Sequence, residues 1–216
     1  MSIPKIIHQL WVGPMIPGIQ ECLDSVTRVM PDHDVRVYGE RELNNVVPEN
    51  LSPVEKSDVL RHRIVYNEGG WWLDADCFAL KPLDGDCAYS LGSQECWQGQ
   101  RVAYALRRKI KPQWQSVCNY TFGSESGNPD QRACELAVIG QTTDYANGWG
   151  GNRGFSNIVG GRTLLPANVY GSRYFAEINP SKYKPKNATT VHLFLSSWVK
   201  HTTNGVLSKA KEVARW

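Results

Sequence analysis

Three pairs of aspartates in this sequence are separated by a single residue, and such a pair can act together on one ligand. The pairs are Asp32/Asp34, Asp74/Asp76 and Asp84/Asp86. Two carboxylates at this spacing suit Mg²⁺ or Mn²⁺, hard ions that keep several waters and share phosphate oxygens with a substrate. The same spacing also arises by chance, so the elements around each pair must decide which of them is placed for chemistry.

The middle pair comes soon after the best-defined helix of the sequence. Ser52 has the residue type of an N-cap, Pro53 suits the first helical position, and Glu55 completes a capping box. The glycine pair 69–70 provides a stop. We therefore expect a helix over about 53–68 that leads directly into a buried strand.

That strand, WWLDAD (71–76), carries the middle pair at its carboxyl end. Alternate residues of an extended strand point to the same side, so Asp74 and Asp76 can converge on one ligand. In parallel α/β sheets, ligands bind beyond the carboxyl ends of the strands. The first and last pairs border a strand start and a Pro-Gly turn, where aspartate is an ordinary turn residue. The middle pair is the one placed for function.

The rest of the chain supports an α/β fold. Apolar runs and turn signals predict further strands at 5–13, 34–39, 88–93, 116–123 and 190–198, and helices at 18–30, 129–140 and 205–214, with a glycine-rich loop at 147–157. Strands alternating with helices indicate a central, mostly parallel mixed sheet flanked by helices. A length of 216 residues predicts one domain, residues 1–216.

Composition excludes several classes of protein. The net charge of +3 is too small to indicate nucleic-acid binding by itself. The N-terminus lacks the pattern of an export signal, and no apolar run approaches the length of a transmembrane segment. The six cysteines have no CxxC spacing, which argues against a zinc cluster and favours reduced, buried thiols. We expect a cytoplasmic protein.

The helix before the aspartate pair adds charged residues. Ser57, Asp58 and Arg61 lie three and four positions apart and form one patch on the expected helix. An ordinary surface ion pair between Asp58 and Arg61 is the simpler interpretation for an isolated helix. The proximity of this helix to Asp74 favours a role in the site.

Single residues elsewhere are weaker candidates. His192 lies in an apolar strand, where a histidine is more often a core residue than a ligand. Ser196 and Trp198 follow it and either contact a phosphate or end the strand. Trp11 follows the first strand and either stacks on a base or fills the core.

Three segments together resemble a known family. IPKIIHQLWVG (3–13), KSDVLRHRIVYNEGGWWLDADCFALKPLD (56–84) and VHLFLSSW (191–198) are similar to the opening, the central motif and the ending of glycosyltransferase family 32, whose sugar transferases carry a DXD motif. More distantly, they resemble the catalytic domain of the large glucosylating bacterial toxins. The likeness covers about 50 of the 216 residues, in the same order and with the same spacing.

The resemblance implies a GT-A (Rossmann-like) fold, a nucleotide-sugar donor, with a UDP-sugar favoured, and a divalent ion, Mn²⁺ or Mg²⁺. It also implies transfer with retention of anomeric configuration. About 1–90 would bind the donor, about 91–190 would face the acceptor, and 190–216 would contact metal and diphosphate. The resemblance also implies a role for each site residue. Trp11 would stack on the base, Asp58 and Arg61 would hold hydroxyls of the sugar, and Asp74 would lie near the ribose or sugar and the metal. Asp76 would bind the metal, His192 would complete its coordination, and Ser196 and Trp198 would touch the diphosphate.

Two positions depart from the family pattern. Trp72 stands where relatives usually have a tyrosine, and an indole supplies no phenol oxygen. The hydrogen bond of that tyrosine must therefore be absent or altered. GWGGNRG (148–154) replaces a Thr-Gly-Pro-like loop, so acceptor recognition is open to change.

Other functions remain to be weighed against sugar transfer. A glycosidase would need two carboxylates flanking a glycosidic bond, and neither a metal-like pair nor a basic partner helps that chemistry. A non-catalytic glycan- or nucleotide-sugar-binding protein would use its eight tryptophans for binding. The expected acceptor is a glycan or glycolipid. The basic cluster RRKIK (107–111) leaves an anionic polymer, including nucleic acid, as an alternative acceptor, although a solvent-exposed basic surface is the simpler interpretation of this cluster. No residue identifies itself as a nucleophile or general base.

Overall fold

The architecture is given by a computed structural model of the chain. The residues that it describes are 3–83, 89–93, 117–140, 158, 164–165 and 189–192. Several expectations fall outside them: the basic cluster 107–111, the loop 147–157, the helix 205–214, and the residues Asp84, Asp86, Ser196 and Trp198.

The elements follow one another as strand, helix and strand through the first eighty residues. In chain order they are β1 (Ile6–Leu10), α1 (Pro17–Val29), β2 (Asp34–Tyr38), α2 (Glu40–Asn44), α3 (Pro53–Glu68), β3 (Gly70–Leu73), β4 (Cys77–Ala79), β5 (Tyr89–Ser93), β6 (Val117–Ser124), α5 (Pro129–Gly140), β7 (Leu164–Leu165) and β8 (Thr190–His192). The elements expected in the described ranges are all present.

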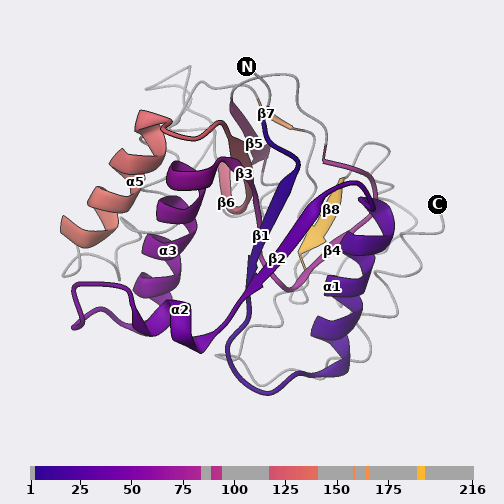
Figure 1. Ribbon diagram of the computed structural model, residues 1–216, viewed down its shortest axis with the longest axis horizontal. Coiled ribbons are helices and arrows are strands. Elements are labelled where there is room, and N and C mark those ends of the chain that lie inside the picture. Colours follow the sequence, from indigo (N-terminus) through magenta and orange to yellow (C-terminus); the bar gives the residue numbers. More distant parts are fainter. Residues whose placement is uncertain are drawn as a thin grey trace, which may run out of the picture.

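The main sheet has the strand order β2-β1-β3-β6-β5-β7 (Figure 1). β1 lies parallel to both β2 and β3, and β5 lies parallel to β7. β6 is inserted antiparallel between β3 and β5, so it runs against the other strands. The expected mostly parallel mixed sheet is confirmed.

β8 does not join this sheet. It pairs antiparallel with β4 in a separate two-stranded ribbon, in which Cys77 lies opposite His192. The ribbon therefore carries a residue from near the end of the chain to the place where β3 ends.

Two apolar cores cover the two faces of the sheet, and successive tryptophans of β3 enter different ones. Trp72 packs with α3 and α5 residues such as Val65 and Val138, whereas Trp71 packs with Val26 of α1 and with two residues of β4. Figure 1 shows α3 and α5 on one side of the sheet and α1 with the β4–β8 ribbon on the other. This alternation is what a strand buried on both faces requires.

The helix α3 has the ends that its sequence predicts. The Ser52 side chain accepts a hydrogen bond from the Glu55 amide at 3.3 Å, and the Glu55 carboxylate accepts one from the Ser52 amide at 2.7 Å. The helix ends at Gly69, whose φ of 68° lies in the left-handed region. The capping box and the glycine stop fix where the charged residues of α3 lie relative to β3.

Gly70 allows β3 to approach β1 closely. Its φ is 93°, and a Cβ at this position would lie 2.7 Å from the carbonyl oxygen of Ile6 and 3.2 Å from Nε2 of His8. His8 is fully buried there, with Nε2 2.8 Å from the Gly69 carbonyl oxygen. A side chain at position 70 would push the central strand away from its neighbour.

None of the helices in the described ranges is long and apolar enough to span a bilayer. Cys22, Cys77 and Cys134, the cysteines whose side chains are described, are buried and carry free thiols, as expected.

Candidate active site

The two aspartates of the DXD motif converge through a turn and not along an extended strand. β3 ends at Leu73, and the amide of Cys77 donates a hydrogen bond to the carbonyl oxygen of Asp74 at 2.9 Å. The tight turn over 74–77 directs both carboxylates to one place beyond the carboxyl end of β3. The expected location is confirmed, but the expected reason, alternation along a strand, is wrong.

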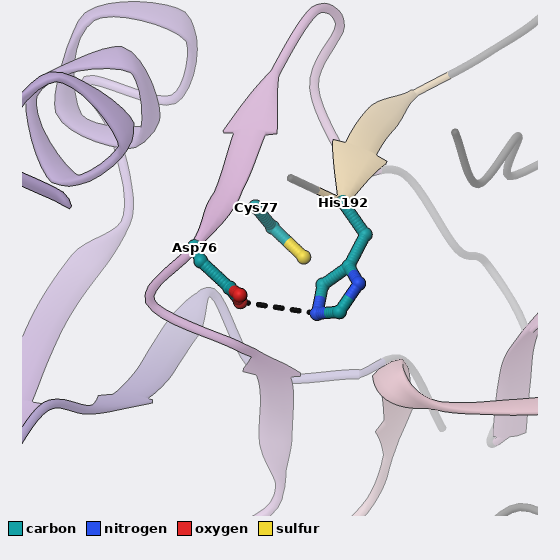
Figure 2. A group of neighbouring side chains, drawn as sticks. All are labelled: Asp76, Cys77 and His192. Carbon is teal, nitrogen blue, oxygen red and sulfur yellow. Dashed lines mark ion pairs between the residues drawn. The ribbon is translucent and has the colours of Figure 1, made fainter. Parts of the chain in front are cut away.

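His192 lies where the two carboxylates meet. Its Nε2 is 3.0 Å from Oδ1 of Asp76 and 3.7 Å from Oδ2 of Asp74. The imidazole stacks on the ring of Tyr120 from β6, with 4.5 Å between ring centroids. Since β8 holds the histidine opposite Cys77, the β4–β8 ribbon is the element that completes the cluster (Figure 2).

The charges of this cluster shift the pKa of its members in opposite directions. Burial by itself would lower the pKa of His192, but the nearby carboxylates of Asp76 and Asp74 outweigh it and raise the pKa to about 9. Burial by itself would raise the pKa of Asp74, but the Arg61 guanidinium and then His192 and Trp72 hold it below its usual value. The two carboxylates therefore favour a positive charge at the position of the His192 ring.

Arg61 and Asp58 of α3 form a buried pair and not the solvent-exposed pair that an isolated helix would present. Arg61 Nε lies 3.0 Å from Asp58 Oδ1, and both side chains are less than a tenth exposed. The Arg61 Nη1 atom lies 3.2 Å from Asp74 Oδ1 and donates a hydrogen bond to the Asn119 carbonyl oxygen at 2.6 Å. Arg61 therefore links the helix to the DXD turn.

Ser57 and the Asn119 side chain complete the surroundings of this pair. Arg61 Nη2 donates to Ser57 Oγ at 3.3 Å, and Asn119 Nδ2 donates to Asp58 Oδ1 at 3.2 Å. Buried charges need such partners to remain ionised. Ser57 therefore supports Arg61 from within the same helix.

Trp72 supplies a hydrogen bond of its own in place of a tyrosine hydroxyl. Its indole Nε1 donates to Asp74 Oδ1 at 2.7 Å. The guanidinium carbon of Arg61 lies 5.3 Å from the centroid of the Trp72 ring, within the range of a cation–π contact. Asp74 Oδ1 is thus held by Trp72 and Arg61, while Oδ2 faces His192.

These residues line a cavity of about 440 Å³ at the carboxyl ends of β1 and β3. The cavity is of the size that small-molecule ligands occupy. Its polar wall consists of Ser57, Arg61, Asp74, Asp76 and His192, and its apolar wall is formed by Leu10, Trp11, Val12, Leu43, Pro53, Val54, Trp72 and Ala75. Trp11 is half-buried, and its amide donates to the Tyr38 carbonyl oxygen at 3.1 Å.

The cluster has the ligand atoms of a metal site. One ligand atom each from Asp76, Cys77 and His192 lies within 4.8 Å of the others. Ligands at about 2.1 Å from an octahedral ion are about 3.0 Å apart. The 3.0 Å between Asp76 Oδ1 and His192 Nε2 matches that spacing. These side chains therefore fit a divalent ion.

The structure brings together most of the residues singled out from the sequence. Trp11, Arg61, Asp74, Asp76 and His192 line one cavity, and Asp58 lies behind Arg61. Sequence reasoning missed Cys77, Asn119 and Tyr120. Cys77 directly follows the motif, but an extended strand would have pointed it away from the two carboxylates. No sequence signal marked the other two.

Comparisons with known proteins agree with this geometry. No family model matches the chain. Inositol phosphoceramide mannosyltransferases 2 and 1 of Schizosaccharomyces pombe are 28% and 29% identical to it over 98 residues. The matches cover 38% of this chain and only 27% and 31% of those relatives.

Solved structures match over nearly the whole chain. The galactosyltransferase LgtC, solved with donor and acceptor sugar analogues, has a TM-score of 0.56 at 12% identity, covering 97% of this chain and 95% of that one. A glycosyltransferase involved in glycosylating the major capsid of PBCV-1 has a TM-score of 0.50 at 12% identity, covering 96% and 99%. The chain has the GT-A fold of glycosyltransferases, as its resemblance implied. Within that class its sequence is similar to the yeast mannosyltransferases.

Proposed function

We propose that this protein is a metal-dependent glycosyltransferase that moves a sugar from a nucleotide-sugar donor to an acceptor hydroxyl. The observation that carries the proposal is the convergence of Asp74, Asp76, His192 and Arg61 on one cavity at the carboxyl end of β3. In open α/β sheets this edge is where ligands bind. The GT-A fold and the sequence similarity to mannosyltransferases support the same assignment.

The donor is proposed to lie along the cavity from Trp11 to the DXD turn. Trp11 lies after β1 on the apolar side of the cavity, where it can stack on the base. A UDP-sugar is favoured because the resemblance to family 32 and the glucosylating toxins implies it. Arg61 would hold hydroxyls of the sugar, with Asp58 fixing its guanidinium from behind, and Asp74 would lie between sugar and metal. Ser196 and Trp198 are proposed to contact the diphosphate.

Asp76 and His192 would hold the divalent ion, Mn²⁺ or Mg²⁺, with Asp74 close to it. The ion, when bound, supplies a Lewis acid for the negative charge that develops on the leaving diphosphate. Arg61, held by Asp58, fixes the sugar so that the acceptor hydroxyl meets the anomeric carbon, which replaces a random encounter by a positioned one. The bond from the anomeric carbon to the diphosphate oxygen breaks with its electron pair on that oxygen. The acceptor oxygen takes its place on the carbon, and the proton of the acceptor hydroxyl passes to the leaving diphosphate.

The acceptor is proposed to be a glycan or glycolipid. The relatives are named for mannosylating inositol phosphoceramide, which supports a lipid-linked acceptor, although the matches span less than a third of those proteins. Retention of anomeric configuration rests on the family resemblance. We assign donor binding to about residues 1–90, acceptor binding to about 91–190, and metal and diphosphate contacts to 190–216 of a single domain.

The test is nucleotide release from a panel of UDP-, GDP- and CMP-sugars, with Mn²⁺ or with chelator, in wild type and Asp76→Asn. The expected result is release from one donor that is lost with chelator and in the variant. A glycosidase would cleave glycosides and remain active in chelator. If the panel is silent, calorimetry of donor binding in Mn²⁺ follows.

Each outcome of the calorimetry has a separate meaning. Metal-dependent donor binding without release points to a missing acceptor, and adding glycan or glycolipid acceptors should then restore turnover. Absence of both release and metal-dependent binding overturns the proposal in favour of a non-catalytic glycan-binding protein of the same fold.

A further inference from the structure

Cys77 lies beside two of the proposed metal ligands, Asp76 and His192. Its sulfur is within 4.8 Å of ligand atoms of Asp76 and His192, and its side chain is fully buried. Figure 2 shows the sulfur turned toward the imidazole of His192, on the same side as the Asp76 carboxylate. Two features place it there: the turn after β3, and the register of the β4–β8 ribbon, which sets Cys77 opposite His192.

The other described cysteines show what an ordinary buried thiol looks like in this fold. Cys22 lies on α1 and Cys134 lies on α5, where it packs in the apolar core with Val138. Neither belongs to a group of metal-ligating side chains, and within the described ranges the group around Cys77 is the one such cluster found. Cys77 is therefore distinguished by its neighbours and not by its burial.

The set of ligand atoms decides which ions the cluster prefers. Mg²⁺ and Mn²⁺ favour oxygen ligands, whereas sulfur and imidazole nitrogen favour Zn²⁺ and ions of similar chemistry, such as Co²⁺. Zn–S and Zn–N bonds of about 2.3 and 2.1 Å put the two ligand atoms about 3.6 Å apart in a tetrahedral site. From a separation of at most 4.8 Å, the sulfur reaches such a site by a small side-chain movement.

We propose that Asp76, Cys77 and His192 together bind a thiophilic divalent ion, Zn²⁺ or Co²⁺, at the place assigned above to the hard ion. This deepens the proposed function, because the two kinds of ion then compete for Asp76 and His192. On binding, the thiol proton of Cys77 leaves to solvent and a metal–sulfur bond forms, with no change in oxidation state. The thiophilic ion occupies the site in a different geometry, and Zn²⁺ then displaces Mn²⁺.

The experiment uses Co²⁺ as a spectroscopic probe on the full chain, without donor. A thiolate ligand gives Co²⁺ a near-ultraviolet charge-transfer band that oxygen and nitrogen ligands do not give. The expected result is a band in wild type that saturates at one Co²⁺ per chain and disappears on adding Zn²⁺. The band should be lost in Cys77→Ser and in Asp76→Asn, and retained in the matched control Cys134→Ser.

Because Cys77 is buried, the variants are first compared with wild type by circular dichroism and thermal unfolding. Cys77→Ala is the second variant if the serine variant unfolds. A third measurement needs no variant: Zn²⁺ should slow alkylation of Cys77 relative to Cys22, which is also fully buried, as followed by mass spectrometry of the modified peptides.

The outcomes separate this proposal from the glycosyltransferase assignment. Co²⁺ binding without a charge-transfer band, a band that survives in folded Cys77 variants, or equal protection of the two cysteines overturns the sulfur ligand. The donor panel with Mn²⁺ is unaffected by any of these results. Conversely, a silent donor panel leaves the Co²⁺ band in place if the cluster is a metal site of another kind.

Discussion

The indole of Trp72, the penultimate residue of β3, donates a hydrogen bond of 2.7 Å to Asp74, the first aspartate of the DXD motif. Trp72 is buried against α3 and α5, so its position is set by the core and not by solvent. One oxygen of Asp74 is consequently fixed by the interior of the protein, and the other faces His192.

Replacing Trp72 by Phe should loosen Asp74 without removing any proposed ligand. Phe keeps an aromatic ring over Arg61 but has no N–H to donate. We expect kcat/KM for nucleotide release to fall by about tenfold or more, because misplacing a group at the site by a fraction of an ångström is costly. Stability should fall by about 2 kcal/mol through lost packing. Steady-state kinetics and denaturant unfolding measure the two effects.

Trp71→Phe is the matched control for this prediction. Trp71 is equally buried on the neighbouring position of β3, but it packs in the other core against Gly123 and does not line the cavity. It should lose similar stability and change kcat/KM by less than about threefold. Equal kinetic losses in the two variants would show that Trp72 acts only through packing.

The pair of Asp58 and Arg61 should contribute far more to stability than a surface ion pair. Asp58→Asn leaves the buried guanidinium of Arg61 without one of its two carboxylates, and we expect a loss of about 3 kcal/mol in the free energy of unfolding. The same substitution in an exposed pair, Asp34→Asn beside Arg36, should cost less than about 1 kcal/mol. Urea unfolding measures the loss of stability in both variants. Similar losses in Asp58→Asn and Asp34→Asn would contradict the buried-pair interpretation.

Local sequence signals predicted the elements that carry the site. The ends of α3 followed from Ser52, Glu55 and the glycine pair 69–70, because capping is decided by a few neighbouring residues. The position of Asp74 at the sheet edge followed from the strand before it. These features need no information from distant parts of the chain.

Contacts between distant segments were beyond that reasoning. β4 is three residues long, and its partner β8 lies more than one hundred residues further along the chain. Without that pairing, His192 was only a weak candidate that the family resemblance strengthened, and Cys77 was not a candidate at all. The hydrogen bond from Trp72 to Asp74 was likewise not predicted from the sequence.

The substitution Gly70→Ala tests whether the close approach of β1 and β3 supports the site. Gly70→Ala must tolerate a φ of 93° and a Cβ 2.7 Å from a backbone oxygen of β1. We expect a loss of about 3 kcal/mol or more, and weaker donor binding because the wall between β1 and β3 shifts. Thermal unfolding and donor calorimetry measure the two.

Gly127→Ala separates backbone strain from the steric contact. Gly127 also has a positive φ, 72°, but a Cβ there meets nothing within 4 Å. Gly127→Ala should lower the free energy of unfolding by only about 1 kcal/mol and leave donor binding unchanged. A loss as large as that of Gly70→Ala would mean that φ alone, and not the approach to β1, accounts for both.

His62 should make the protein less stable as pH falls from 6.5 to 5. Its ring is buried on α3, hydrogen-bonded to Gln131 at 2.8 Å and stacked on Phe122, and burial lowers its pKa to about 3. In this range the unfolded chain takes up a proton on His62 and the folded chain does not, so stability falls with falling pH. At about 1.4 kcal/mol per pH unit the loss is about 2 kcal/mol. The variant His62→Gln has no titrating group at this position. Between pH 6.5 and 5 its free energy of unfolding, measured in urea, should therefore fall by about 2 kcal/mol less than that of wild type. If the free energy of unfolding falls equally in both proteins, another group takes up the proton.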